Sequence, residues 1–419
     1  MTTTDCGCPE FRTSRRRLLG GIAAGAALGT VSQLIGDAHR QVAFGAEPGG
    51  NVVVVLSLRG GADGLSLVVP RGADHDLLAA ARPNLVVPES VLLGDDPRFG
   101  FHPALAPLMP FWQAGVFGAV HAVGLSAPNR SHFDATEEME DADPGTVSRV
   151  GWINRMTGLS ASPLPEDAVA LGVPLAPASL VGPAPALSAY DLSDLAMPEV
   201  GTSAQTRRTA LTRAWGTSTT PLAAGVRTAI GVTQRLSPLV DAVDSNVHTL
   251  AYPEGPLQQV LASTAALIRA DLGTRIVAID YGDWDMHADL GRVDGGWMVD
   301  QATHFASSLA AFMLDLGTAA SRVTVVTLTE FGRRVEENGS GGVDHGYGNA
   351  TFLLGAGVNG GAVHGRWPGL AQLEDGDLAL GQDYRSVLWE VLGSRFSDLS
   401  GSRSTIFPGF TPEAVGAMA

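Results

Sequence analysis

The segment Arg322-Val-Thr-Val-Val-Thr-Leu-Thr-Glu-Phe-Gly-Arg333 predicts a buried strand and the polar turn at its end. Val323 to Leu328 combine β-branched and apolar residues with threonine, as central strands do. The apolar run ends before Glu330, and a glycine-rich loop then presents Asp344 and His345 side by side. Because open α/β sheets bind ligands at the carboxyl ends of their strands, these groups indicate a functional edge.

Further apolar runs predict other strands of the same sheet. Residues 51–58 and 275–281 are continuous apolar segments, which are typical of parallel strands covered on both faces. Residues 116–123 form a third such run. Helical patterns occur at 103–113, 147–159, 297–316 and 383–396. Strands that alternate with helices predict an α/β fold, and the sequence from about 175 to 260 predicts a helical insertion.

Composition and charge exclude several classes of function. The 419 residues are 45% hydrophobic and carry a net charge of −16, which indicates an acidic globular protein. All 27 basic residues are arginine, so Schiff-base and phosphate-loop lysine chemistry is excluded. Basic runs are confined to the N-terminus, so we expect no nucleic-acid partner. Because Cys6 and Cys8 are the only cysteines, the rest of the chain has no disulfide framework and no cysteine-based zinc site.

The N-terminus has the pattern of an export signal. Ser14-Arg-Arg-Arg-Leu-Leu-Gly20 fits the twin-arginine motif, a mildly apolar segment follows from Leu18 to Ile35, and Ala43–Ala46 offers small residues for cleavage. We therefore expect export by the twin-arginine translocase to the periplasm or the cell exterior, removal of residues 1–46, and a single domain from 47 to 419. We expect no stable membrane span in the mature form; a retained N-terminal anchor helix is the alternative.

Aspartates and histidines follow the predicted strands. Asp63 lies in the glycine-rich turn after the first strand, where the alternative is an ordinary turn aspartate. Asp283 and His287 follow the 275–281 strand, are four residues apart and would share one face of a helical turn. In an extended segment, Asp285 and His287 would share a face instead. Both residue types are ligands of divalent metals, so the sequence predicts a metal site at this edge.

The loop after the 116–123 strand carries the candidate catalytic residues. Ser131 stands where a helix is expected to begin, which suits a nucleophile that attacks an anionic ester. The alternative for Ser131 is a helix cap, with Asp134 three residues further on. Arg130 offers a bidentate clamp for a phosphoryl or sulfuryl oxygen, and His132 is a further catalytic candidate.

Five motifs together resemble a known family. They are Leu58-Arg-Gly-Gly-Ala-Asp-Gly64, Asn129-Arg-Ser-His-Phe-Asp134, Thr329-Glu-Phe-Gly-Arg333, Asp344-His-Gly346 and Gly360-Gly-Ala-Val-His-Gly-Arg-Trp-Pro368. In this order they closely resemble the twin-arginine-exported family catalogued as domain of unknown function 1501. That family is similar to the alkaline phosphatase and sulfatase superfamily, which implies a doubly wound, mainly parallel sheet with helices on both faces and a metal centre at the carboxyl edge.

The resemblance implies roles for individual residues. Asp63 occupies the position of the first metal-ligand aspartate, Asp283 with His287 matches a ligand pair, and His364 matches the final histidine. The metal cofactor is expected to be one or two divalent ions, with zinc, manganese, magnesium and calcium left open.

One ligand pair departs from the superfamily pattern. Asp344-His345 comes fourteen residues after Glu330, whereas the superfamily pair follows its strand directly. Either Glu330 is itself a ligand, or the loop folds back and brings Asp344 and His345 into the site. The nucleophile also has two candidates, because Ser126-Ala-Pro-Asn-Arg130 fits the sulfatase pattern whose first residue becomes formylglycine, and Ser126 therefore competes with Ser131.

Two functions are compatible with these residues. The first is an exported metal-dependent hydrolase of phosphate or sulfate esters, with a metal-activated serine nucleophile and a small anionic ester as substrate. The alternative is a non-catalytic exported binding or accessory protein with a degenerate metal site. The fold by itself does not decide between them.

Overall fold

A computed structural model describes residues 49–147, 149–173, 175–197, 203–240, 243 and 252–419. The predicted export signal, residues 1–46, lies outside the described residues. Within the described ranges, no helix combines the length and the apolar character that crossing a membrane requires.

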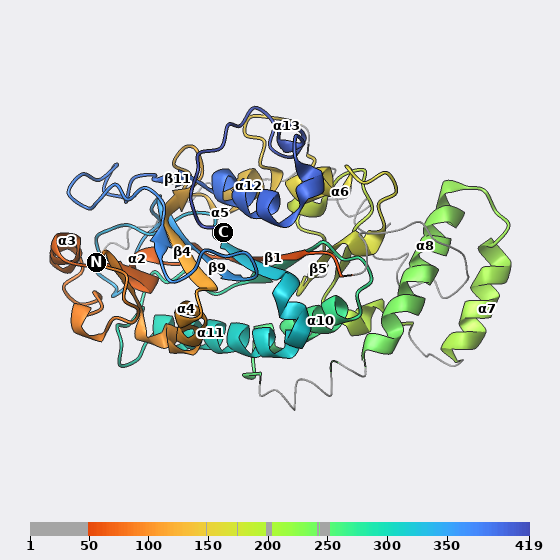
Figure 1. The fold of residues 1–419 in the computed structure, drawn as a ribbon, viewed down its shortest axis with the longest axis horizontal. Helices are drawn as coiled ribbons and strands as arrows, with labels where there is room; N and C mark the ends of the chain where they lie inside the picture. The colour runs from red at the N-terminus through yellow and green to blue at the C-terminus, as the bar shows by residue number, and fades with distance from the viewer. Residues whose placement is uncertain (1–48, 148, 174, 198–202, 241–242, 244–251) are drawn as a thin grey trace, which may run out of the picture. The chain divides into compact units, whose positions relative to one another are not determined.

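A nine-stranded sheet forms the centre of the fold (Figure 1). Its strands follow the order β10-β4-β9-β8-β1-β7-β5-β6, and β11 also pairs with β4. β9 is antiparallel to both β8 and β4, and the other pairings are parallel, which confirms the predicted α/β fold with a mainly parallel sheet. The strands are β1 (Val52–Leu58), β4 (Phe117–Gly124), β5 (Ala168–Leu171), β6 (Leu187–Ala189), β7 (Ile276–Tyr281), β8 (Val323–Leu328), β9 (Asn349–Gly355), β10 (Val363–His364) and β11 (Gln382–Asp383).

The three central strands bring three loops to one edge of the sheet. β1 pairs in parallel with β7 on one side and with β8 on the other, and the residues of all three strands are almost entirely buried. Leu58 lies opposite Tyr281, and Ser57 lies opposite Leu328. The chain therefore leaves these strands at the same edge, the edge at which parallel α/β sheets bind ligands.

Short elements and helices connect the strands. A small antiparallel sheet pairs β2 (Val68–Pro70) with β3 (Phe99–Phe101). The α-helices are α2 (Gly64–Leu67), α3 (Ala73–Ala81), α4 (Met109–Gln113), α5 (His132–Asp141), α6 (Trp152–Thr157), α7 (Ala204–Trp215), α8 (Pro221–Leu236), α10 (Pro256–Arg269), α11 (Trp297–Leu316), α12 (Tyr384–Arg395) and α13 (Arg403–Ile406). The 3₁₀ helices are η1 (Glu89–Val91), η2 (Pro103–Leu108), η3 (Pro165–Asp167), η4 (Ala178–Leu180), η5 (Leu192–Leu195), η6 (Ser237–Leu239), η7 (Gly317–Arg322) and η8 (Ser397–Leu399).

Helices cover both faces of the sheet (Figure 1). On one face, Val387 of α12 and Met139 of α5 share a hydrophobic core with Val53 of β1. On the other face, Phe305 of α11 packs against Phe352 of β9, with their ring centroids 5.9 Å apart. This arrangement is the doubly wound one that the sequence resemblance implies, and it leaves the strand ends accessible at the edge.

Two predicted helices are shorter in the structure. The segment 103–113 consists of η2 followed by α4, because Pro107 and Pro110 cannot donate the backbone hydrogen bonds of a continuous α-helix. The helix predicted at 147–159 is confined to α6, which begins after Gly151. Neither difference affects the strands that position the site.

The region from 175 to 260 is only partly helical. β6 pairs in parallel with β5, so this region also contributes an edge strand to the sheet. The chain divides into two compact units; α7 and α8 up to Arg235 lie in the smaller unit, and the sheet lies in the larger one. Within the smaller unit, Val226 and Ile230 pack against Leu211 and Trp215. The boundaries of the helical insertion remain a prediction.

Candidate metal centre

Side chains from three separate loops meet at the carboxyl edge of the sheet. His132 begins α5, directly after the loop that leaves β4. Asp285 and His287 lie in the segment after β7, and His345 lies in the long loop between β8 and β9. A β-bridge between Arg333 and His345 shows that this long loop folds back on itself. The folding back that the sequence left open therefore occurs, and it brings His345 to the edge.

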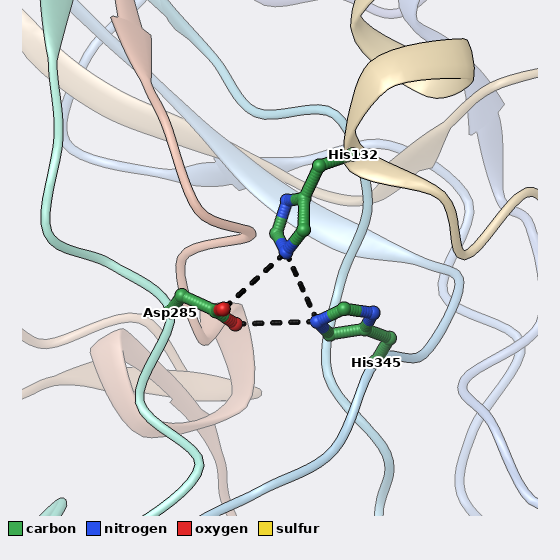
Figure 2. A group of neighbouring side chains, drawn as sticks. All are labelled: His132, Asp285 and His345. Atoms are coloured by element: carbon green, nitrogen blue, oxygen red, sulfur yellow. Dashed lines mark hydrogen bonds and ion pairs between the residues drawn. The ribbon is translucent and has the colours of Figure 1, made fainter. Parts of the chain in front are cut away.

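Three ring nitrogens and one carboxylate converge here. Nε2 of His345 lies 3.0 Å from Nε2 of His132 and 3.0 Å from Nε2 of His287. The Asp285 carboxylate lies 3.2 Å from Nε2 of His345, 3.1 Å from Nε2 of His287 and 3.5 Å from Nε2 of His132. Figure 2 shows His132, Asp285 and His345 pointing toward a common centre, and their ligand atoms all lie within 4.8 Å of one another. We call these three residues the metal group.

Each imidazole is held at its other nitrogen by an oxygen acceptor. The pairs are His132 with Glu330 at 2.7 Å, His287 with Asp344 at 2.8 Å and His345 with the backbone carbonyl of Arg130 at 2.9 Å. Because a carboxylate or carbonyl oxygen only accepts, Nδ1 of each neutral ring carries the proton and donates it. Nε2 of each neutral ring therefore presents a lone pair toward the common centre.

This arrangement fits a divalent metal ion. Lone pairs 3.0 Å apart repel one another, and a cation between them removes the repulsion. Ligands at the nitrogen and oxygen distances of tetrahedral zinc lie roughly 3.3 Å apart, close to the 3.0–3.5 Å separations seen here. Metal-bound imidazoles characteristically donate their second N–H to a carboxylate or a carbonyl, as all three do here.

Arg333 holds the carboxylate of the metal group in place. Its guanidinium is buried and donates to Asp285 Oδ1 at 2.6 Å. The same guanidinium donates to the carbonyls of Gly61 at 2.6 Å, Val343 at 3.0 Å and Trp284 at 3.1 Å. One side chain thus connects the loops that follow β1, β7 and β8.

The pKa shifts in the group have identifiable causes. The hydrogen bond to Glu330 raises the pKa of His132, whereas burial lowers the pKa of His345. Burial alone would raise the pKa of Asp285, but the hydrogen bond and charge of Arg333 outweigh it and lower that pKa. Asp285 is therefore ionised at neutral pH, as a metal ligand must be.

Glu330 and Asp344, both predicted as metal ligands, lie behind the imidazoles. Glu330 is buried, accepts from His132 and also accepts from the backbone N–H of Gly60 at 2.8 Å. Asp344 accepts from His287 and from Asn338 Nδ2 at 3.0 Å. Each carboxylate fixes the orientation of an imidazole, so we assign them to the support of the site.

Asp63 is engaged in a buried ion pair. Its carboxylate is 2% exposed and receives two hydrogen bonds from Arg82, which is itself fully buried. Ser66 Oγ donates to the same carboxylate. Burial alone would raise the pKa of Asp63, but Arg82 outweighs it and lowers that pKa. We therefore do not place Asp63 in the metal group.

Asp283 and His364 also lie outside the metal group. Residues 282–286 form no helical turn, and Trp284 and Met286 are buried while Asp283 and Asp285 are exposed. Asp283 has a left-handed φ of 65°, so no right-handed helical turn forms, and Asp285 joins His345 where Asp283 was expected. His364 belongs to β10 at one end of the sheet order, where its Nε2 bonds the Asn359 carbonyl at 2.6 Å.

The predicted catalytic residues have other partners. Ser131 is the N-cap of α5, and its Oγ accepts from the Asp134 N–H at 3.4 Å. Ser126 is exposed in the preceding loop. The Arg130 guanidinium is bound by Asp377 and, at 3.0 Å, by Asp375. His132 is at the site, but its geometry is that of a ligand.

An open cavity of about 650 Å³ adjoins the metal group. His132, Asp285 and Glu330 contribute to its wall, and Phe133 and Trp297 contribute aromatic surface. A substrate bound there would reach the metal group directly. Cavities beside a metal group, with an apolar wall and a few polar groups, are the usual places for small-molecule substrates.

Asp285 and Arg333 belong to the site but were not among the predicted site residues. The alternation of Trp284 and Met286 with Asp285 and His287 is the period-2 pattern of an extended segment. Arg333 ends the Thr329–Arg333 motif, but the sequence does not indicate its role, because that role depends on contacts with distant carbonyls.

Comparisons with known proteins give only distant likenesses to solved structures. No curated protein matches the sequence. Among solved structures, the C-terminal periplasmic domain of EcEptC from Escherichia coli is similar at 10% identity and a TM-score of 0.36, over 89% of this chain and 92% of that chain. The same domain in complex with Zn is similar at 11% identity and a TM-score of 0.32, over 76% and 77% of the two chains. Likenesses of this size assign neither a site nor an activity.

A family model matches the part of the chain that supplies Asp285, Arg333 and His345. Residues 231–399 match the model of the family described as "Protein of unknown function (DUF1501)", the family that the motifs resemble.

Proposed function

We propose that this protein is an exported metal-dependent hydrolase of phosphate or sulfate esters, with its active site at the metal group. The observation that carries the proposal is the convergence of imidazole Nε2 atoms whose Nδ1 protons are held by oxygen acceptors. His132, Asp285 and His345 supply three ligands, which leaves a further coordination position for water or substrate. His287 lies beside two of these ligands, and an ion that also bound it would take water or substrate at a fifth position.

A divalent ion at this position would activate a water molecule and stabilise negative charge on the leaving oxygen. The chain's own groups prepare the site for that chemistry. Glu330 makes His132 a more basic ligand, and Arg333 keeps Asp285 ionised and oriented. Asp285 and His287 remain nearly half exposed, so the group is open to the adjoining cavity.

The nucleophile in this proposal is a water molecule, in place of the predicted serine. Ser131 Oγ is used as a helix cap, and Ser126 is exposed in the loop before it. A divalent ion would lower the pKa of water at the open position, so no side-chain hydroxyl would be needed.

A metal-binding protein without catalytic activity is the second candidate. Arg130 favours it, because Asp375 and Asp377 already bind the guanidinium that was expected to clamp an anionic ester. The two candidates share the metal group and differ only in turnover.

Metal content and turnover of the purified protein test the proposal. We expect about one bound divalent ion per chain, measured by inductively coupled plasma mass spectrometry. We also expect hydrolysis of at least one aryl phosphate, phosphodiester or aryl sulfate. His345→Ala should lose both the ion and the activity. His364→Ala, which removes a histidine outside the group, is the matched control and should keep both.

The outcomes separate the two candidates. A stoichiometric ion without turnover in any ester class supports the binding protein. A folded protein that takes up no ion, or that loses it equally in the His345→Ala and His364→Ala variants, rejects both.

A further inference from the structure

The charge of the cavity beside the metal group is unusual for a site that accepts anions. Its wall contains six carboxylates and one guanidinium, so it holds five net negative charges when the histidine is neutral. A divalent ion at the metal group would reduce this to three net negative charges. The carboxylates are Glu137, Glu140, Asp280, Asp283, Asp285 and Glu330. Negative charge lining a cavity repels anions and concentrates cations.

One of these carboxylates has no partner. Arg59, the guanidinium of the cavity, lies between Glu140 and Asp280 and is neutralised by them. Glu137 pairs with Arg149. Asp283 is exposed and makes no hydrogen bond or ion pair with any residue in the described part of the chain. Its charge is therefore available to a ligand in the cavity.

Large apolar side chains line the same cavity as this carboxylate. Phe133 is 88% exposed, Leu175 is 68% exposed and Trp297 is 41% exposed, although all three line the same cavity. Clustered exposed apolar residues mark binding surfaces. Aromatic faces next to a carboxylate attract organic cations, because the ring quadrupole and the carboxylate both favour positive charge.

We propose that the cavity binds a ligand that carries a positive charge next to an apolar group, with Asp283 as the carboxylate that recognises the charge. An organic ammonium group has this chemistry. The inference rests on the proposed function only in taking the cavity as the substrate site. If that function is correct, the substrate is an ester that also carries an organic cation, and its cationic part lies against Asp283, which is not a member of the metal group.

The conformation of Asp283 permits a clean substitution. Its φ of 65° lies in the left-handed region, which asparagine adopts as readily as aspartate. Asp283→Asn therefore removes the charge and keeps the shape and the backbone. Asp289 is also exposed with a positive φ of 50°, but it does not line the cavity, so Asp289→Asn is a matched control.

Calorimetric titration with three probes of similar shape tests the proposal without turnover. The probes are benzyltrimethylammonium, benzyl alcohol and benzenesulfonate, each added to the full-length protein. We expect the ammonium to bind tightest and the sulfonate weakest. Asp283→Asn should weaken ammonium binding roughly fivefold and leave benzyl alcohol unchanged, whereas Asp289→Asn should change neither.

The outcomes distinguish this inference from the proposed function. Equal or tighter binding of the alcohol or sulfonate overturns the inference, as does equal weakening by the two asparagine variants. The metal content of the same samples is measured separately. Selective ammonium binding by a protein that holds no metal would reject the proposed function and keep the inference.

Discussion

At the scale of single residues, Arg333 connects the loops that form the site. Its planar guanidinium donates at once to Asp285 and to carbonyls of three loops, which a lysine ammonium cannot do. We predict that Arg333→Lys keeps the fold and the charge but lowers metal affinity roughly 10- to 100-fold, measured by competition with a chelator. Arg334→Lys is the control, because Arg334 is 35% exposed and bonds the Asp375 carbonyl instead. Equal affinities in the two variants would show that Arg333 does not position the ligand.

Asp63 has a structural role that makes a pH-dependent prediction. Its pKa is lower in the folded than in the unfolded chain, so its contribution to stability is full above about pH 3.9 and declines as the pH falls through the folded pKa. Because Asp63→Asn leaves buried Arg82 without its counter-charge, we expect a loss of about 3–5 kcal/mol at neutral pH. Denaturant unfolding at several pH values measures the difference between wild type and variant. A difference that stays constant down to pH 2 would contradict this account.

The assignment of Asp63 shows what the sequence could not reveal. The turn Arg59–Gly64 places an aspartate at a strand end, which is where a metal ligand belongs in this kind of fold. The same residues are equally compatible with an ion pair, and the partner Arg82 lies nineteen residues further along the chain in an unremarkable helix terminus. Only the three-dimensional contact decides between the two roles.

At the scale of elements, Ser131 at the start of α5 can be tested for two roles, that of a helix cap and that of a nucleophile. Ser131→Ala removes the hydrogen bond to the Asp134 N–H, and we expect a loss of about 1 kcal/mol in stability. Because water is the proposed nucleophile, turnover should persist at temperatures where the variant stays folded. Ser126→Ala, in the exposed loop, should change neither property. Loss of turnover in a stable Ser131→Ala variant would return the serine to the catalytic role.

The elements themselves were largely predictable, and their local geometry was less so. Continuous apolar runs predict β1, β7 and β8 because these strands are buried on both faces. The segment after β7 was harder to predict, because four-residue and two-residue spacings of acid and histidine both occur in it. The positive φ of Asp283 is incompatible with a right-handed helical turn, and Asp285 lies beside His287 in its place.

At the scale of the whole molecule, the sequence predicts the type of sheet but not its order. Pairing of β1 with both β7 and β8 depends on contacts between residues more than two hundred positions apart. The apolar run at 351–355 predicts the strand β9 but not its antiparallel direction, because this run resembles those of the parallel strands. The site could therefore be assigned to an edge from sequence, while its members could be selected only from the fold.

The distance along the chain between the ligands has a consequence for how the protein matures. His132 and His345 are 213 residues apart, and Asp285 lies between them on a third loop. An unfolded or half-folded chain cannot present these groups together, since β4, β7 and β8 must first take their places in the sheet. Under the proposed function, metal binding at this site would therefore be a late event that requires a completed fold. A chain that holds the ion would therefore already have a correctly assembled sheet before it becomes active.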